Sequence, residues 1–227
     1  MCGRRTGARS VHSVTLPYPP FELEVSTPRL RLLGATDERL ERLVPFVRDG
    51  VVQGDEVPFD DPMSFYEPSP LREWRWMRSV WRGRGRTEAS WWRLYFVVEA
   101  DGELVGMQDL LAEDFPALGL VSSFSWLAPN ARGRGHGREM RAAILHLAFA
   151  GLAAREALSE AFVDNAASNA VSRALGYEQN GTTWATRRGD PCELQRWTIT
   201  REKWKTAVRT DIELRGVEDC LPFLGVS

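Results

Sequence analysis

Apolar and polar residues recur along the chain with two periods, and these periods predict its strands and helices. Alternation with a period of two predicts strands at residues 28–33, 91–100, 103–111, 120–127, 157–163, 177–186 and 194–200. Spacings of three and four predict helices near residues 36–44, 70–82, 138–152, 164–176 and 201–204, and Thr36-Asp37 is expected to cap the first of them. The order predicts an α/β (α+β) fold with helices packed on a mixed, mostly antiparallel sheet. One β-loop-α-β crossover makes two of its strands parallel.

The same patterns divide the chain into three parts. Residues 1–20 mix Gly, Arg, Ser and Pro without a period, so we expect a disordered or loosely docked extension. Residues 21–206 form the predicted domain, and residues 207–227 are expected to be an irregular C-terminal tail. A chain of 227 residues that is 43% hydrophobic is long enough to bury one sizeable core.

Composition and charge exclude several classes of protein. The formal charge of −2 and the pI near 6.0 argue against an electrostatic nucleic-acid binder. No apolar run reaches membrane-spanning length, and no apolar segment follows the Arg-rich start as in a secretory signal. The three cysteines are odd in number and far apart, which indicates reduced thiols, a cytoplasmic protein and no metal site.

The loop Arg132-Gly-Arg-Gly-His-Gly137 is the strongest chemical signal, because it lies between a predicted strand and a predicted helix. Its glycines let backbone N–H groups converge on an anion, and the helix adds its unpaired first amides. Arg132, Arg134 and Arg138 can add charge-assisted hydrogen bonds. This combination predicts a pyrophosphate site, although a glycine triplet alone is more often a flexible turn.

Other phosphate-binding motifs fit this loop less well. A nucleotide P-loop needs a final Gly-Lys-Ser/Thr, which this loop lacks. In a dinucleotide fingerprint for nicotinamide or flavin cofactors the third glycine comes one residue later and opens a parallel sheet. An Arg-Gly nucleic-acid segment would be disordered and net basic, whereas regular structure frames this one.

The sequence resembles the GNAT acyltransferase superfamily over residues 27–204. The most specific segments are "SWLAPNARGRGHGREMRAAILHLAF" and "DNAASNAVSRALGY", with "TPRLRL" and "GYEQNG" in support. They are similar to the branch of ribosomal-protein N-terminal acetyltransferases and related actinobacterial enzymes. The segment "VEDCLPFLG" resembles a subgroup of that branch in which succinyl-CoA has been considered as the donor.

The resemblance implies where a CoA thioester binds. The parallel strands at residues 120–127 and 157–163 would splay apart, and the pantetheine would pair with backbone near Trp126 and Leu127. The pyrophosphate would lie on the loop and the first helical residues: Arg132, Gly133, Arg134, Gly135, His136, Gly137 and Arg138. Asn165 would bond the pantetheine and Ser168 would lie near the sulfur; the alternatives are a plain helix cap and a small packing residue.

The resemblance also shows where this sequence departs from its relatives. They often carry a glutamate as general base at the position that Ser122 occupies here. Asp109 is the best substitute because it interrupts an apolar strand, ahead of Glu113, Asp114 and Glu160; attack by an already neutral amine needs no base. Ser168 is the candidate acid, and an N–H near Trp126 and Leu127 is the candidate oxyanion donor.

The acceptor side is predicted less sharply. Trp74, Met77 and Trp81 share a helix face, which indicates an acceptor pocket, a homodimer surface or ordinary core packing. The acidic loop at residues 55–61 could attract a cationic amine. The sequence thus predicts an N-acyltransferase that moves an acetyl group, or as an alternative a succinyl group, from CoA to a primary amine of a small molecule, a peptide or a protein N-terminus. The alternative is a non-catalytic acyl-CoA-binding module; nucleic-acid and membrane partners are not expected.

Overall fold

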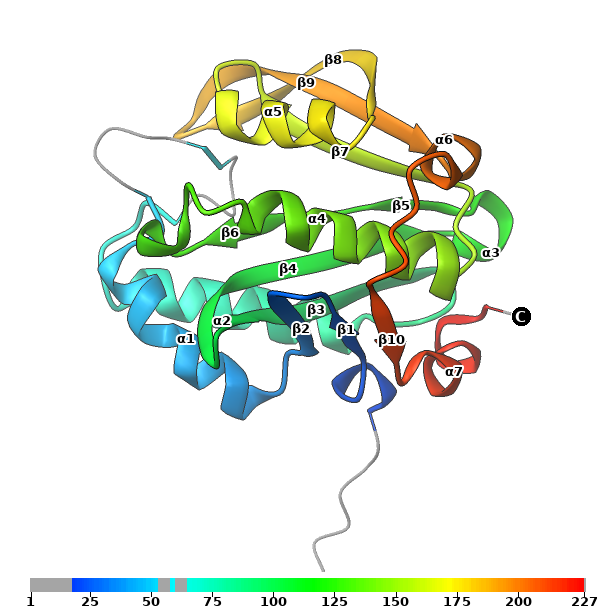
Figure 1. Ribbon diagram of the computed structural model, residues 1–227. Coiled ribbons are helices and arrows are strands. Elements are labelled where there is room, and N and C mark those ends of the chain that lie inside the picture. The colour runs from blue at the N-terminus through cyan, green and yellow to red at the C-terminus, as the bar shows by residue number, and fades with distance from the viewer. Residues whose placement is uncertain (1–17, 53–57, 60–64, 227) are drawn as a thin grey trace, which may run out of the picture.

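The computed structural model describes residues 18–52, 58–59 and 65–226, in which ten strands form one sheet (Figure 1). The order is β10-β1-β2-β3-β4-β5-β7-β9-β8, and β6 pairs with β4 beside β5. The strands are β1 (Glu24–Ser26), β2 (Leu30–Gly34), β3 (Trp91–Ala100), β4 (Glu103–Glu113), β5 (Leu120–Ser122), β6 (Ser125–Leu127), β7 (Glu156–Phe162), β8 (Glu178–Arg187), β9 (Asp190–Thr200) and β10 (Glu213–Arg215).

Helices cover both faces of this sheet. They are α1 (Asp37–Asp49), α2 (Leu71–Gly85), α3 (Phe115–Leu118), α4 (His136–His146), α5 (Ala166–Ala174), α6 (Arg201–Lys205) and α7 (Val217–Cys220). One hydrophobic cluster joins α4 to the sheet through side chains such as Ile144 and Phe96. A second cluster joins α1 and α2 to the opposite face through side chains such as Leu43, Trp76 and Val97. The two clusters follow from the alternation of side chains along β3.

The predicted fold class is confirmed. Among the described residues, paired strands of the sheet run antiparallel except β5 and β7, which are parallel with Leu120 opposite Glu156. Thr36 caps α1 as expected, because its side chain accepts from the backbone N–H of Arg39 at 3.2 Å. The hairpin turn at Asp101-Gly102 joins β3 to β4, which pair along nearly their whole length.

The predicted single strand at residues 120–127 is divided into β5 and β6. The backbone N–H of Asp109 still donates to the carbonyl of Phe124 at 2.9 Å, so the register is kept. The N–H of Phe124, however, donates to the carboxylate Oδ1 of Asp109 at 2.7 Å. The ladder is interrupted because a side chain takes the amide that would otherwise pair with a backbone carbonyl.

Both ends of the described chain are more regular than the sequence patterns predict. The expected irregular tail contains β10, which pairs with β1, and a segment that buries Cys220 and Leu224 completely. Tyr18, within the expected extension, packs its ring on Phe223 at 5.3 Å between centroids. Residues 1–17 of that extension lie outside the described residues. A three-residue strand shows too little alternation to be found in a sequence.

Within the described residues, the helices are too short or too polar to cross a membrane.

Candidate active site

The parallel pair β5 and β7 separates at a defined point. Its pairing ends at Ser122 and Leu158. In the described part of the chain β6 pairs only with β4, and β7 from Ser159 onward pairs only with β9. The edges of β6 and β7 that face each other therefore make no ladder, as the resemblance predicts.

Backbone amides of β6 point toward this separation. The N–H of Ala128 donates to Val105 on β4 at 2.8 Å, so alternation directs the amide of Trp126 to β4 as well. The amides of Ser125 and Leu127 then face β7. They can hydrogen bond to an extended chain, or to a carbonyl oxygen, placed between the strands. Trp126 itself is buried on the α1/α2 face, where its ring contacts Phe65.

The predicted glycine loop lies at the start of α4. Gly133 and Gly135 have φ angles of +73° and +82°, a region that side chains strongly disfavour. Gly135 is the N-cap of α4, and it offers no side chain to occupy the helix's first amides. A Cβ at Gly135 would lie 3.3 Å from Nη2 of Arg29, so the loop also needs the space that glycine leaves. These features fit a pyrophosphate.

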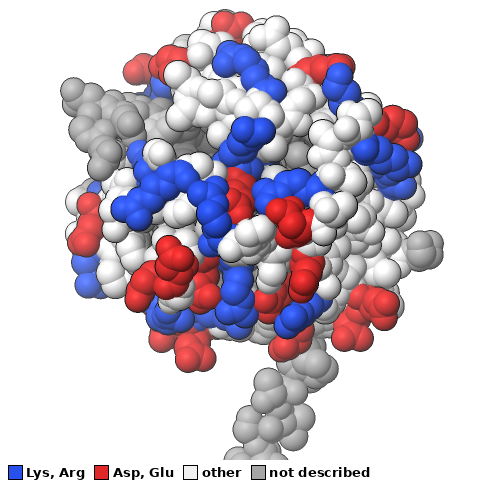
Figure 2. Space-filling model, viewed as in Figure 1, with Lys and Arg blue, Asp and Glu red and all other residues white. Residues whose placement is uncertain are grey.

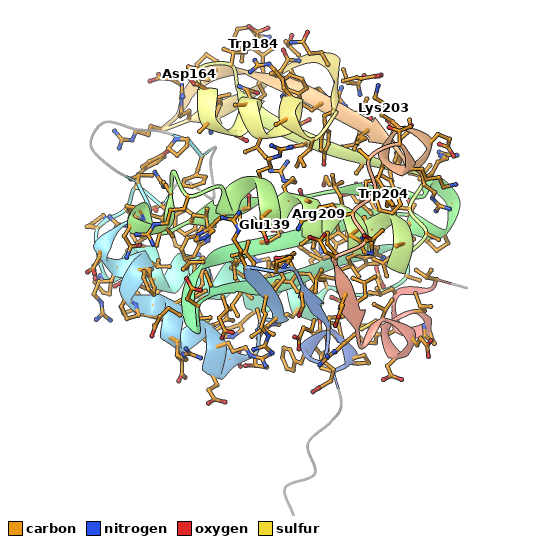
Figure 3. The ribbon with its side chains drawn as sticks, viewed as in Figure 1. Glu139, Asp164, Trp184, Lys203, Trp204 and Arg209 are labelled. Carbon is orange, nitrogen blue, oxygen red and sulfur yellow. The ribbon has the colours of Figure 1, made fainter. Side chains whose placement is uncertain are left out.

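A clamp that the sequence does not reveal holds this loop in place. Arg29 donates from Nε to Glu139 at 2.6 Å and from Nη1 to the carbonyl of Arg134 at 3.0 Å. Glu139 also accepts from the hydroxyl of Thr27 at 2.6 Å. Burial raises the pKa of the Glu139 carboxyl, but Thr27 and Arg29 outweigh it and the pKa is lowered. Figure 3 labels Glu139 on α4, and Figure 2 shows basic side chains gathered over this helix.

The loop arginines divide into two groups. Arg132 donates from Nε to the carbonyl of Leu127 at 3.2 Å and from Nη2 to the carbonyl of Val51, so it ties the loop to β6 and to the residues that follow α1. Arg134 and Arg138 are exposed beside the start of α4 and can reach an anion there. His136 is buried, and its Nδ1 has no hydrogen-bond partner among the described residues.

Asn165 and Ser168 lie at the start of α5. Asn165 caps this helix, with its Oδ1 accepting from the backbone N–H of Ser168 at 3.0 Å. The cap leaves the amide Nδ2 of Asn165 as a donor. The two helices are adjacent here, because a Cβ at Gly137 on α4 would lie 4.0 Å from the side chain of Val171 on α5. The half-buried hydroxyl of Ser168 thus lies one turn before the contact between the helices.

Buried polar groups that the sequence patterns did not identify surround the separation. Arg141 on α4 is 6% exposed and donates to the hydroxyl of Ser159, the first β7 residue past the parallel pairing, at 2.7 Å. Burial raises the pKa of Tyr177, and the Arg141 guanidinium opposes that effect. Within the described chain, Nε of Arg141 and Oε1 of Gln108 have no partners. Such orphaned groups fit the amides of a pantetheine arm.

Asp109 is buried and both of its carboxylate oxygens are engaged. Oδ2 accepts from Nε of Arg93 at 2.7 Å and also from Nη2, while Oδ1 accepts from Phe124. Burial raises the pKa of Asp109, and Arg93 and the Phe124 amide oppose it. The other candidate bases lie elsewhere: Glu113 and Asp114 are exposed at the end of β4, and Glu160 pairs with Arg196 on the surface.

The segment between α1 and α2 covers the α1/α2 face of the site. Phe59 packs on Phe124 with ring centroids 5.4 Å apart, and Phe65 packs on Trp126 at 6.0 Å. The β8–β9 hairpin approaches the same segment, because Arg188 lies over the ring of Tyr66. The acids of the predicted acidic loop, residues 55–61, lie outside the described residues.

The aromatic face predicted on α2 is on the surface. Trp74 is 67% exposed and Trp81 is 53% exposed, so core packing is the wrong interpretation for both. The buried face of α2 carries Trp76 and Val80 instead. In the part of the chain that the structure describes, acids, histidines and cysteines do not cluster in a way that could hold a metal ion.

Comparison with known proteins agrees with this geometry. A family model described as an acetyltransferase (GNAT) domain matches residues 29–178. The fold is similar to RimL, a ribosomal L7/L12 alpha-N-protein acetyltransferase in complex with coenzyme A, with 19% identity and a TM-score of 0.61 over 77% of this chain and 95% of that one. It is also similar to an acetyl transferase from Salmonella typhimurium that modifies the N-terminal serine of ribosomal protein L7/L12 (19% identity, TM-score 0.59, 77% and 96% covered). A third similar structure is the microcin C7 self immunity acetyltransferase MccE in complex with acetyl-CoA and AMP (14% identity, TM-score 0.59, 76% and 93% covered).

Proposed function

Because the chain belongs to the GNAT acetyltransferase family, we propose that it transfers an acetyl group from acetyl-CoA to the primary amine of a small molecule, a peptide or a protein N-terminus. One observation carries the proposal. Gly133 and Gly135, which both have a left-handed backbone, lead into α4. They lie beside the edge of β6 that faces β7 and makes no ladder. Converging amides for a pyrophosphate and a free strand edge for a pantetheine are thereby adjacent.

Each predicted binding residue has a task in this proposal. The amides at Gly133 to Gly137, with Arg134 and Arg138, would hold the pyrophosphate. Arg132 would act indirectly, since it positions the loop through backbone carbonyls. The amide of Leu127 and the Nδ2 of Asn165 would bond the pantetheine. Arg141 and Gln108 would satisfy its remaining polar groups from the α4 side.

The chemistry proposed for these residues is acyl transfer. An acyl-CoA supplies an activated acyl group as a thioester. The Ser125 amide, which is farther along β6 from the glycine loop, would donate to the thioester carbonyl oxygen as charge develops there. As the N–C bond forms and the C–S bond breaks, Ser168 on α5 would deliver a proton to the departing thiolate, directly or through a water molecule. The proton released by the amine nitrogen would replace it.

Asp109 is better suited to positioning than to proton abstraction. Its carboxylate is occupied by Arg93 and by the N–H of Phe124, and it interrupts the ladder along β4 at the point between β5 and β6. We therefore propose that Asp109 shapes the strand edge beside Leu127, and that the amine attacks in its neutral form.

A second candidate function is a non-catalytic acyl-CoA-binding module. The observation that favours it is the absence of a carboxylate at Ser122, together with the engagement of Asp109. Succinyl-CoA as donor, a cytoplasmic location and a homodimer through the exposed face of α2 also stay proposals. The free thiols of Cys192 and Cys220 agree with a reducing compartment. Sedimentation at several protein concentrations tests the dimer.

Free thiol release distinguishes the candidates. The protein is incubated with acetyl-CoA or succinyl-CoA and a panel of amines, and CoA binding is measured separately by calorimetry. Amine-dependent thiol release supports the transferase, and the faster donor identifies the acyl group. Tight CoA binding without thiol release for any amine would support the binding module instead.

A further inference from the structure

A cavity of about 290 Å³ opens on the α1/α2 side of the sheet, between α2 and residues 65–67. Phe65 and Trp76 form its aromatic wall. Four arginines of one helix line it as well: Arg72, Arg75, Arg78 and Arg82. Steps of three, three and four residues place these arginines on one stripe of α2, facing the same space.

The positive charge of this stripe is only partly compensated. Arg72 donates to backbone carbonyls, including that of Glu67 at 2.8 Å, and Arg75 pairs with the Glu67 carboxylate. In the ranges that the structure describes, Arg78 and Arg82 form no ion pair, and both are exposed. Like charges three and four residues apart on a helix destabilise it. The formal charge of the whole chain is −2, so the positive charge of this stripe is local.

The cavity is close to the proposed site of transfer. Its wall residue Phe65 packs directly on Trp126 of β6, so one aromatic ring separates the cavity from that strand. Trp76 belongs to the same buried cluster as Trp126. Phe65 has a φ angle of +54°, a region that a bulky side chain seldom adopts, and such strain is concentrated at binding sites.

We propose that this cavity binds the anionic group, a phosphate or a carboxylate, of a small amine acceptor; this rests on the proposed transfer to an amine. Guanidinium groups match both anions through paired hydrogen bonds, and two of them at adjacent turns can share one phosphate. A volume of about 290 Å³ is just below the usual range of about 300–1,000 Å³ for small-molecule sites, which fits a small acceptor.

Three acceptors that share an aminoethyl group test the proposal: O-phosphoethanolamine, β-alanine and ethanolamine. Their steady-state kinetics are measured with acetyl-CoA for the wild-type chain and for Arg78→Gln/Arg82→Gln. Arg42→Gln, an exposed arginine on α1, is the matched control. We expect the double variant to lower kcat/KM about tenfold or more for an anionic amine, and less than about twofold for ethanolamine. The anionic amine whose kcat/KM falls more in the double variant identifies the natural anionic group as a phosphate or a carboxylate.

A binding measurement separates this inference from the transfer reaction. Titration of the CoA complex with inorganic phosphate is expected to give heat with the wild-type chain and with Arg42→Gln, but not with the double variant. Unchanged CoA affinity shows that the double variant is folded. Phosphate binding without thiol release for any amine would reject the transfer but keep the anion site. Equal kinetic losses for all three amines, or no loss and no phosphate binding, would overturn the proposal.

Discussion

At the scale of single residues, the conformation of the cofactor loop depends mainly on glycines, which have no side chain. Gly135 combines a left-handed backbone with a neighbouring guanidinium, Nη2 of Arg29, at 3.3 Å from the point where a Cβ would lie. A substitution there has two separate costs: the backbone must adopt a disfavoured region, and the clamp of Arg29 on Glu139 must move.

Gly135→Ala is therefore expected to weaken CoA binding by about tenfold or more, since about 1–2 kcal/mol is needed to hold alanine in the left-handed region. Calorimetric titration with CoA measures the affinity. Gly85→Ala is the control, because Gly85 on α2 has no positive φ and no atom within 4 Å of an added Cβ. Equal CoA affinity in the two variants would contradict the assignment of the loop.

The carboxylate of Glu139 makes the folding stability of the protein depend on pH. Its folded-state pKa lies below its unfolded value of about 4.3, so the carboxylate stabilises the fold above that pH. Stability is lost as the pH falls through the folded pKa. Glu139→Gln should lower the unfolding free energy by about 1.5 kcal/mol at pH 6, and the difference should shrink below about pH 4. Denaturant unfolding across pH checks this, with the exposed Glu41→Gln as control. A difference that stays constant with pH would argue against the clamp.

Asp109 can be tested as a positioning residue. Asp109→Asn should lower kcat at least about tenfold, because the Phe124 amide and the strand edge shift. The pH profile of kcat/KM should keep the position of its ascending limb. Arg93→Gln should reproduce the loss, since Arg93 holds the carboxylate. Loss of the ascending limb in Asp109→Asn alone would make Asp109 the general base.

At the scale of elements, the sequence predicts correctly those features that depend on neighbouring residues alone. The Thr36 cap and the Arg132–Gly137 loop at the start of α4 needed only neighbouring residues, and both are where the sequence places them. The contact of Arg29 with Glu139 joins residues 110 positions apart, and no pattern within either segment indicates it. On α2 two stripes contain tryptophan, so the period alone could not choose Trp76 over Trp74 as the core residue.

The contribution of the C-terminal segment to the stability of the fold can be measured. Leu224, which follows α7, is fully buried in the hydrophobic cluster that joins α4 to the sheet. The sequence around it nevertheless predicts an irregular tail. Leu224→Ala should cost about 2–5 kcal/mol of unfolding free energy, as expected for a buried leucine. Val208→Ala, at a position that is 42% exposed, should change it by less than about 0.5 kcal/mol. Denaturant unfolding of both variants compares the two, and equal effects would mean that the segment is not part of the core.

For the whole molecule, the separation of β6 from β7 divides the sheet into two parts that share only a short ladder, Leu120 to Ser122 with Glu156 to Leu158. Figure 1 shows β7, β8, β9 and α5 together on one side of this junction. A ligand that bonds to both edges should join the two parts mechanically.

Hydrogen exchange with and without CoA tests this view of the molecule. Protection should increase in peptides that cover β6 and the start of α4, because the amides of Leu127 and Gly135 gain partners. Peptides from β8, the exposed edge strand, serve as the internal control. At a CoA concentration of about 100 times Kd, the global stability should also rise by about 2.7 kcal/mol. An equal change in protection of β6 and β8 on addition of CoA would contradict binding at the strand separation.

The pairing of β1 with β10 has a consequence for protein engineering. It brings the two ends of the described chain together, with Tyr18 packed on Phe223. A circular permutant can therefore join residue 225 to residue 18 by a short linker and begin instead at the β8–β9 turn, where a Cβ added at Gly189 would meet no described atom within 4 Å. Such a permutant would retain every strand pairing and place its new termini beside Tyr66, so that a fluorophore attached there would report on ligands entering from the α2 side.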